Sequence, residues 1–328
     1  MKGGFDLKQM NITVIGCGRW GSFIAKYLAD IGHRITLYGR ASSARMRELL
    51  ETRRNSLMQL PDSVTLTTDL KGALRDIDLL VISVGSQTLR TLLTELRAAG
   101  FGKGKLVLCM KGLEIGTGKR LSEIVREELG EGVTAAVWLG PGHVQEFCAG
   151  IPNCMVIDSE DEATKNILVD AFSGELIRFY YGQDMIGNEI GAAAKNVIGI
   201  AAGLLDGLRL STLKGALMSR GTREIARLIK ALGGNELSAY GLCHLGDYEA
   251  TVFSAFSHNR QFGEAFAKGE QFPDLAEGYY TVKALNLLSR RYGVELPICH
   301  TVEDVLYNGA QAREAVFRLF ERSLKNEF

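Results

Sequence analysis

The stretch that decides the fold is ITVIGCGRWG, residues 12–21, in which glycines follow an apolar run. The spacing Gly16-x-Gly18-x-x-Gly21 is typical of a turn that binds a dinucleotide pyrophosphate. Gly16 permits the tight turn, Gly18 lets the backbone approach the phosphates, and Gly21 lets the next helix pack closely on the sheet. Because a helix N-terminus also favours anions, this stretch predicts a dinucleotide-binding βαβ unit.

Strand patterns and helical patterns alternate along the chain up to about residue 183. A helix is expected over Ser22–Ile31, directly behind the glycine turn. This alternation predicts an α/β fold with a doubly wound, Rossmann-type and mostly parallel sheet. In such sheets ligands bind beyond the carboxyl ends of the strands, so the loops after the strands should hold the chemistry. The strands are expected at Met10–Ile15, Arg34–Tyr38, Leu79–Val84, Lys105–Met110, Thr134–Leu139, Asn153–Asp158 and Leu176–Tyr180.

The pattern changes near residue 184, where strand-like runs cease and helical spacing begins. We therefore expect two domains, a dinucleotide-binding domain at residues 1–184 and an all-α substrate domain at residues 185–328. The helical patterns cover residues 186–205, 211–232, 260–268, 275–292 and 299–322.

The composition limits the kind of partner. Lys and Arg, 38 in all, balance 38 Asp and Glu, which disfavours nucleic acid or an anionic membrane and favours small molecules or a second copy, as in a homodimer. No apolar run reaches the length of a membrane span, and residues 1–9 show no signal-peptide pattern and are expected to be a loose leader. The six cysteines form no C-x-x-C pair, which disfavours a metal site and favours reduced, buried thiols in the cytoplasm.

The end of the second expected strand bears on the choice of nicotinamide cofactor. Sites for NAD usually carry an acidic residue there, whereas this chain reads Tyr38-Gly39-Arg40. Arg40 is suited to accept the 2′-phosphate of NADP(H), with Arg45 in support. The alternative is an ordinary surface arginine, which would leave NAD(H) as the cofactor. The sequence favours NADP(H).

One charged residue stands inside the apolar helical run at residues 190–203. Lys195, which precedes Asn196, is its only charge. Burial of an ammonium group is costly and lowers its pKa toward the range where it exchanges protons near neutral pH. We therefore expect Lys195 to act as a general acid/base at the junction of the two domains. The alternative is a lysine that reaches solvent from an apolar helix.

Two more polar clusters lie within residues 246–260. Asp247 and Thr251 share one face if their segment is helical, although Asp247 could simply cap that helix. The run from Ser257 to Arg260 offers donors in front of an expected helix, which suits an anion or, equally, an ordinary turn.

Together these motifs resemble those of the NAD(P)-dependent glycerol-3-phosphate dehydrogenase family, over nearly the whole chain. The resemblance implies reversible reduction of dihydroxyacetone phosphate to sn-glycerol 3-phosphate, which supplies the backbone of phospholipids. It is carried by Gly16–Gly21, Asn55 with Leu60-Pro61, Lys111-Gly112-Leu113-Glu114, Gly140-Pro141, Gly191–Ile200, Ser219-Arg220-Gly221, Gly246-Asp247, Asn259–Gly263 and Glu277-Gly278-Tyr279.

The resemblance also implies roles for individual residues. Lys195 would exchange the proton at the C2 oxygen, Lys111 would reach the substrate, and Asp247 would join them in the catalytic set. Two lysines near one small anion lower the pKa of one of them and stabilise the developing alkoxide. The candidate substrate contacts are then Lys111, Gly140, Gly142, Lys195, Asn196, Asp247, Thr251, Ser257, His258 and Asn259, and the candidate cofactor contacts are Gly16, Gly18, Arg19, Trp20, Gly21, Arg40, Lys111, Val144, Arg260 and Glu277.

Departures from the family lie on the substrate side. Gly142-His143 stands where the family has Ser or Thr before an aromatic residue, so a hydroxyl is missing. His258 stands where the family has an Arg that grips the substrate phosphate. The lost charge-assisted bonds correspond to about 1.5–3 kcal/mol, or roughly tenfold to a hundredfold in binding. Near the nicotinamide, Val84-Gly85 replaces the family's Val-Pro.

Three functions therefore stay open. Either Arg260 and His143 compensate and the substrate is dihydroxyacetone phosphate, or the chain is a related NADP-dependent dehydrogenase for another polyol phosphate or hydroxy acid. The third alternative is a non-catalytic NADP(H)-sensing protein. A sensor has no need of Lys111 and Lys195, which favours an enzyme.

Overall fold

The computed structural model describes residues 9–274, 276–323, 326 and 327, so most of the expected leader, residues 1–8, lies outside it. Within this part the chain forms two compact units. The first contains the described residues up to Met110 together with Leu121–Met185, and the second contains Lys111–Arg120 and the described residues from Ile186 onward. The loop that carries Lys111 therefore belongs to the helical unit, although it lies far before residue 184 in the sequence.

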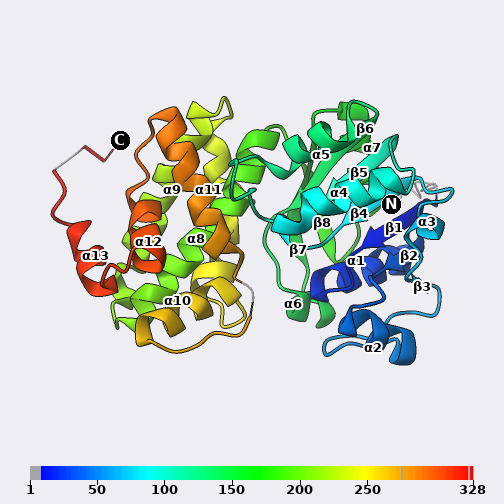
Figure 1. Ribbon diagram of the computed structural model, residues 1–328, viewed down its shortest axis with the longest axis horizontal. Coiled ribbons are helices and arrows are strands. Elements are labelled where there is room, and N and C mark those ends of the chain that lie inside the picture. Colours follow the sequence, from blue (N-terminus) through cyan, green and yellow to red (C-terminus); the bar gives the residue numbers. More distant parts are fainter. Residues whose placement is uncertain (1–8, 275, 324–325, 328) are drawn as a thin grey trace. The chain divides into compact units, whose positions relative to one another are not determined.

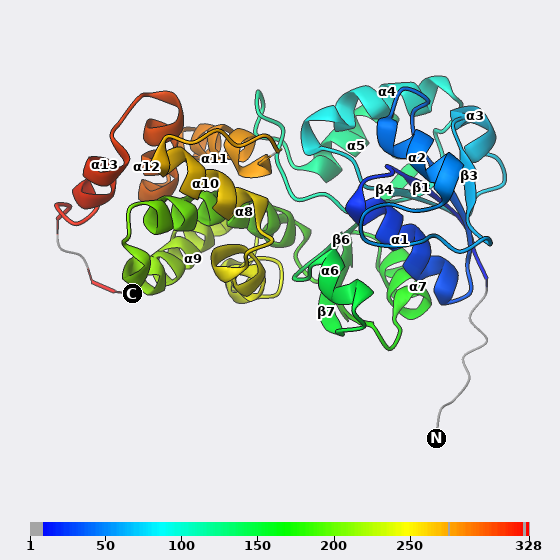
Figure 2. The same cartoon turned by 90° about the horizontal axis from the view of Figure 1, so that it is seen from below.

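The first unit is a doubly wound α/β fold, as the sequence predicts (Figure 1). Its described strands form an eight-stranded sheet in the order β3-β2-β1-β4-β5-β6-β7-β8, parallel except between β6 and β7. Figure 2 shows α4 and α5 on one face of this sheet and α1 and α7 on the other. The strands are β1 Asn11–Ile15, β2 Arg34–Tyr38, β3 Thr65–Thr67, β4 Leu79–Ile82, β5 Gly104–Leu108, β6 Val133–Leu139, β7 Asn153–Ser159 and β8 Ile177–Tyr181, and the helices are α1 Arg19–Asp30, α2 Ala44–Thr52, α3 Leu70–Ala73, α4 Leu89–Ala98, α5 Leu121–Leu129, α6 Val144–Cys148 and α7 Glu162–Phe172.

The strand at the sheet edge is the one that the sequence prediction omits. The other strands lie where they are expected, with ends shifted by two residues at most. The edge strand β3 contains only Thr65, Leu66 and Thr67, and none of these side chains is fully buried. A short strand without an apolar run gives no detectable periodicity.

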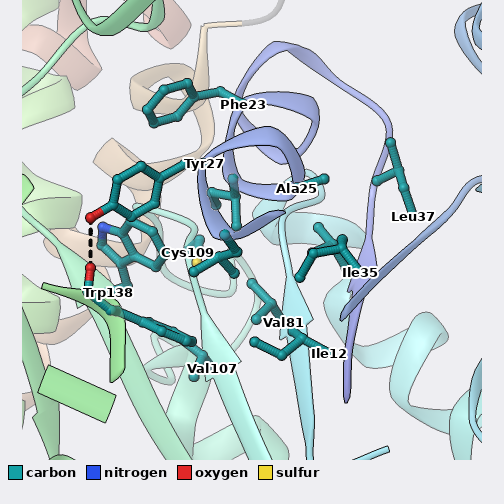
Figure 3. Close-up of a cluster of buried hydrophobic side chains, with 14 of the residues drawn as sticks. Ile12, Phe23, Ala25, Tyr27, Ile35, Leu37, Val81, Val107, Cys109 and Trp138 are labelled. Carbon is teal, nitrogen blue, oxygen red and sulfur yellow. Dashed lines mark hydrogen bonds between the residues drawn. The ribbon is translucent and has the colours of Figure 1, made fainter. Parts of the chain in front are cut away.

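A large apolar cluster holds the sheet against α1 and α7 (Figure 3). Ile12 of β1 and Trp138 of β6 are almost fully buried in it. Tyr27 of α1 packs there as well, and its hydroxyl donates to the carbonyl of Phe172 at 2.6 Å. Burial of each such side chain contributes about 1.5–3 kcal/mol, so the strand and helix that flank the glycine turn are firmly fixed.

The second unit is built from helices around α8. Most of the helical patterns are confirmed, but the single stretch expected at residues 299–322 is wrong, because it breaks into two helices around Gly309, whose φ is +72°. The helices are α8 Met185–Gly207, α9 Lys214–Ala231, α10 His258–Lys268, α11 Glu277–Tyr292, α12 Pro297–Tyr307 and α13 Ala312–Arg318, with short 3₁₀ turns at Ser211–Leu213, Glu236–Tyr240 and Leu245–Asp247 and a π-helical segment at Glu249–Phe253.

Helix α8 is long and apolar enough to cross a membrane by length and composition alone. In the structure, however, 83% of its most apolar window is buried, which is typical of the core helix of a folded domain. The sequence prediction that this run is not a membrane span rests on a different observation, the interruption of the apolar run by Lys195 and Asn196.

The thiols are only partly as expected. All six cysteines lie in the described residues and none forms a disulfide. Four of the thiols are buried, as the sequence predicts for most of the cysteines, whereas Cys148 is exposed and Cys154 is half-buried.

Candidate active site

The glycine turn after β1 has the geometry of a phosphate-binding turn. Gly16 has a φ of +116°, and a Cβ there would lie 2.0 Å from the carbonyl oxygen of Ser83. A Cβ on Gly21 would lie 1.9 Å from the carbonyl oxygen of Gly16, so both positions require glycine. Around Gly18 the nearest atom to a Cβ is a guanidinium nitrogen of Arg45, at 3.7 Å. The open space at Gly18, at the N-terminus of α1, fits a dinucleotide pyrophosphate.

Arginines lie around this turn. Arg19 is the exposed first residue of α1, and Arg45 approaches Gly18 as described. Arg40 follows β2, and its Nη2 lies 3.2 Å from Oε1 of Glu95 in an exposed ion pair. A pair this exposed is worth little, so Arg40 can exchange Glu95 for a phosphate.

Trp20 and Val144, two candidate cofactor contacts, belong largely to the packing of the first unit. The Trp20 ring is half-buried and stacks on Phe23, with 5.3 Å between ring centroids, and it also lies 6.1 Å from the ring of Phe147. Val144 begins α6 and is buried in the main core. Any contact of these residues with a cofactor is therefore made by side chains already fixed by the core.

The loop between β6 and α6 explains the missing hydroxyl at position 142. Gly142 has a φ of +137°, and a Cβ there would lie 2.4 Å from the ring of Phe147. Gly140 has a φ of +126°, and a Cβ at this position would lie only 3.1 Å from Cα of Met155. A serine at position 142 would have a strained backbone and would collide with the Phe147 ring. The conformation of this loop therefore requires glycine at position 142.

Three charged residues meet inside the helical unit. Oδ2 of Asp247 accepts from Nζ of Lys111 at 2.6 Å and lies 3.2 Å from Nζ of Lys195. Nζ of Lys195 also donates to the hydroxyl of Thr251 at 2.8 Å. The Asp247 side chain is only 1% exposed, and its Oδ1 is buried without a hydrogen-bond partner in the described part of the chain. With both lysines protonated, two ammonium groups face one carboxylate, and the cluster carries one net positive charge.

The electrostatics of this cluster act mainly on Lys195. Burial lowers the pKa of Lys195 to about 8, with the nearby ammonium of Lys111 acting in the same direction and the carboxylate of Asp247 acting against both. A lysine with this pKa is partly protonated and partly neutral just above neutral pH. It can therefore give or take a proton, which an ordinary surface lysine does poorly.

The loop that carries Lys111 is tied to α8 at two points. Nδ2 of Asn196 donates to the carbonyl of Lys111 at 2.8 Å. At the other end of the loop, Arg120 forms an ion pair with Glu189 of α8 at 2.9 Å, and both side chains are largely buried. Lys111 is therefore held beside Asp247 by the same helix that carries Lys195.

Asn196 and Asn259 form a chain of amide hydrogen bonds. Nδ2 of Asn259 donates to Oδ1 of Asn196 at 3.0 Å, and Oδ1 of Asn259 accepts from the amide of Gly278 in α11 at 2.9 Å. Glu277, just before Gly278, is the half-buried first residue of α11. These amides link α8, α10 and α11, so they orient the cluster at least as much as they could bind a ligand.

Glycines on α8 let the other site residues come close. A Cβ on Gly199 would lie 2.7 Å from Cγ2 of Thr251, and a Cβ on Gly203 would lie 2.0 Å from the carbonyl oxygen of Arg260. Thr251 and the backbone of Arg260 therefore pack directly on α8, about one and two turns after Lys195.

The run from Ser257 to Arg260 begins α10. Ser257 is the N-cap, because its hydroxyl accepts from the amide of Arg260 at 3.3 Å. His258 is half-buried in the first turn, with its ring 6.1 Å from the ring of Phe272. Arg260 points to acidic side chains of its own unit, with Nη1 2.8 Å from Oδ2 of Asp206.

Two buried residues beside Asp247 carry no signal in the sequence. Burial lowers the pKa of His244 to about 4, so the ring is neutral. Its Nδ1 donates to the carbonyl of Gly191 on α8 at 2.8 Å, and its Nε2 accepts from the hydroxyl of Tyr248 at 2.7 Å. These bonds fix the turn that presents Asp247, and only the three-dimensional structure brings them together.

A Rossmann-type dinucleotide-binding unit and a helical unit with a buried lysine beside a carboxylate fit one class of protein, the NAD(P)-dependent oxidoreductases. Two family models narrow the class, the N-terminus of NAD-dependent glycerol-3-phosphate dehydrogenase over residues 11–165 and its C-terminus over residues 184–317. The chain belongs to this family.

Named relatives agree with the family models over the full length of the chain. The glycerol-3-phosphate dehydrogenase [NAD(P)+] of Geobacillus kaustophilus is 37% identical, over 97% of this chain and 96% of the relative, and that of Thermoanaerobacter sp. is 35% identical, over 97% and 99%. The crystal structure of glycerol-3-phosphate dehydrogenase from Coxiella burnetii matches with a TM-score of 0.90 and 29% identity, over 96% of this chain and 99% of that one.

Proposed function

We propose that this chain catalyses the reversible reduction of dihydroxyacetone phosphate to sn-glycerol 3-phosphate with NADP(H), or with NAD(H), and so supplies glycerophospholipid synthesis. The observation that carries the proposal is the buried cluster of Lys111, Asp247 and Lys195. Family membership supports the substrate, since the named relatives carry this activity in their names.

Lys195 is the proposed acid/base of the reaction. A bound nicotinamide supplies the hydride to C2 in reduction and accepts it in oxidation. As C2 gains the hydride, the carbonyl oxygen becomes an alkoxide and takes the proton of the Lys195 ammonium, which becomes a neutral amine. In oxidation, the amine of Lys195 takes the hydroxyl proton, so atoms and charge balance in both directions.

Lys111 and Asp247 set the charge and the position of Lys195 in the same site. The ammonium of Lys111 stabilises the alkoxide electrostatically and disfavours the charged form of Lys195. Asp247 keeps both lysines in place, and its buried Oδ1 can accept a hydrogen bond from a hydroxyl group of the substrate. We assign the polyol hydroxyls to Asp247 and Thr251, and the substrate phosphate to the start of α10 at His258 and Asn259.

A second candidate is a related dehydrogenase for another polyol phosphate or hydroxy acid. It is favoured by His258, which lacks the bidentate donors of a guanidinium, and by Gly142, where no hydroxyl is present. The proton chemistry of Lys195 would be the same, so only the substrate separates the two candidates.

An NADPH-oxidation assay with dihydroxyacetone phosphate and a panel of keto acids tests the proposal. Turnover with dihydroxyacetone phosphate is the expected result. Turnover with another carbonyl compound alone would support the second candidate. Binding of NADPH without turnover on any member of the panel would leave the chain as an NADP(H)-sensing protein and refute both enzymatic proposals.

We also propose that the enzyme is cytoplasmic and forms a homodimer. None of the six cysteines forms a disulfide, which supports a reducing compartment, and exposed aromatic side chains such as Phe253 and Phe256 favour contact with a second copy. Fractionation of cells tests the location, and sedimentation equilibrium of the purified chain tests the dimer.

A further inference from the structure

Asp206, about three turns after Lys195 on α8, is the centre of a second group of charges, of which Lys214 is buried and Asp206 and Arg260 are half-buried. Its Oδ2 accepts from Nζ of Lys214 at 2.7 Å and from Nη1 of Arg260 at 2.8 Å, and its Oδ1 accepts from the hydroxyl of Ser211 at 2.7 Å. Burial alone would raise the pKa of Asp206, but these donors lower it below its ordinary value. Such ion pairs add little to the free energy of unfolding. What they position is therefore more informative about their role than their contribution to stability.

Both cations of this group also hold the backbone of the segment that carries Thr251. Nζ of Lys214 donates to the carbonyl of Val252 at 3.0 Å and lies 5.2 Å from the centroid of the Phe253 ring. Nε of Arg260 donates to the carbonyl of Ser254 at 3.0 Å. Asp206 on α8 thus holds two cations, and the cations hold two backbone carbonyls that are two residues apart.

The carbonyls of Val252 and Ser254 lie at the C-terminal end of the π-helical segment, where backbone carbonyls lack hydrogen-bond donors from their own helix. The π-helical segment Glu249–Phe253 ends at Ser254, whose backbone is extended with a φ of −65° and a ψ of 135°. The last carbonyls of a helix have no partner inside the helix, and cations are favourable at that end. Lys214 and Arg260 supply both the donors and the positive charge.

We propose that Lys214 is a positioning residue of the active site, which acts with Arg260 and through Asp206 to hold Thr251 in hydrogen-bonding distance of Lys195. The proposal rests on the proposed function only in naming Lys195 as the acid/base. It gives Arg260 a role other than the cofactor contact expected from the sequence, because its Nε and Nη1 are bonded to Ser254, Asp206 and Glu264.

Displacement of Thr251 changes the surroundings of the Lys195 ammonium in a defined way. The groups that face this ammonium are Asp247 from the 3₁₀ turn, Lys111 from its loop, Thr251 from the π-helical segment and the neutral His244. The hydroxyl of Thr251 accepts a hydrogen bond from the charged form of Lys195. Its loss disfavours that form and lowers the pKa of Lys195.

Lys214→Met is the decisive variant, because it keeps most of the side-chain volume and removes the charge. We expect kcat to fall about tenfold or more while KM for NADPH is unchanged, and the loss of reductase kcat/KM at high pH to begin about one pH unit lower. Lys214→Arg should restore both. The matched control is Lys230→Met on the same helix, since Lys230 pairs with Glu236 at the surface and should change neither quantity.

Crystal structures of the variants provide a readout that does not depend on substrate. In Lys214→Met the distance between Oγ1 of Thr251 and Nζ of Lys195 should exceed about 3.5 Å. If this variant does not fold, Arg260→Lys, which removes the hydrogen bond to the carbonyl of Ser254, should change kcat, the pH profile and the distance between Thr251 and Lys195 in the same direction but by a smaller amount. An unchanged distance together with an unchanged pH profile would overturn the proposal. Lack of wild-type turnover on dihydroxyacetone phosphate would instead overturn the proposed function, and the distance would still decide this inference.

Discussion

Replacement of Asp247 by Asn tests the electrostatic account of the cluster most directly. The carboxylate lies 3.2 Å from the ammonium of Lys195, and at an effective dielectric constant of about 20 one charge at this distance contributes about 5 kcal/mol. Relaxation and water entry reduce this value, and we expect about half of it to remain. That corresponds to a fall of roughly two units in the pKa of Lys195, from about 8 toward about 6.

The direction of the change in activity depends on whether the reaction requires the protonated or the neutral form of Lys195. Reduction needs the ammonium, so reductase activity is lost as pH rises through the pKa. In the Asp247→Asn variant this loss moves to lower pH, and at pH 7 the protonated fraction of Lys195 falls from about nine-tenths to about one-tenth. Reduction at pH 7 should therefore slow about tenfold from this cause alone.

The assay is the pH dependence of kcat/KM for NADPH oxidation between about pH 5 and 10. The position of the high-pH decline, rather than its height, is the quantity to compare, because Asp247→Asn also weakens substrate binding. Asp304→Asn, an exposed change on α12, is the control and should leave the profile unchanged. A decline that stays in place or moves to higher pH in Asp247→Asn would refute the reasoning.

Three further predictions concern the substrate loop, the phosphate site and the cofactor. Gly142→Ser should lower the melting temperature by several degrees in calorimetry, because of its φ and the Phe147 ring, and should not improve kcat/KM; improved catalysis at unchanged stability would show that only a hydroxyl is missing. His258→Arg should lower KM for dihydroxyacetone phosphate about tenfold or more, and an unchanged or higher KM would remove the argument from the lost guanidinium. Arg40→Ala should raise KM for NADPH about tenfold with little change for NADH; equal changes for both cofactors would contradict a 2′-phosphate contact.

The fold of the first unit could be predicted because its signals are local. Gly16, Gly18 and Gly21 stand next to the strand and helix that they join, and the apolar runs identify most strands. The edge strand β3 escapes prediction because its stability comes from pairing with β2 rather than from its own side chains. The break between α12 and α13 is also missed by the sequence prediction. The helical spacing of apolar residues continues across Gly309, whereas the backbone leaves the helical conformation there.

The candidate site could be predicted only where a residue breaks its local pattern. Lys195 stands out because one charge interrupts an apolar helix, and its burial beside Asp247 agrees with that interpretation. By contrast, Lys111 is part of the helical unit through bonds with residues 85 and 136 positions away, which no local pattern encodes. Arg260 looks like an anion ligand in sequence, yet its nearest partners are acidic residues on α8 and α10.

The charge balance of the cluster gives a physical reason why the helical unit contains so much irregular backbone. Lys195 and Asp247 are buried together with the half-buried Lys111, and the excess positive charge costs stability that a well-packed apolar core would not. Asp247 and Thr251 both contact the ammonium of Lys195, and the segment that carries Thr251 packs against Gly199 of α8. The glycines of α8 allow this close approach. Lys214 donates a hydrogen bond to the carbonyl of Val252 in the π-helical segment, and His244 joins the 3₁₀ turn to the carbonyl of Gly191 on α8. The stability lost by this arrangement is recovered when an anionic substrate binds, because a ligand that binds only the folded state stabilises it.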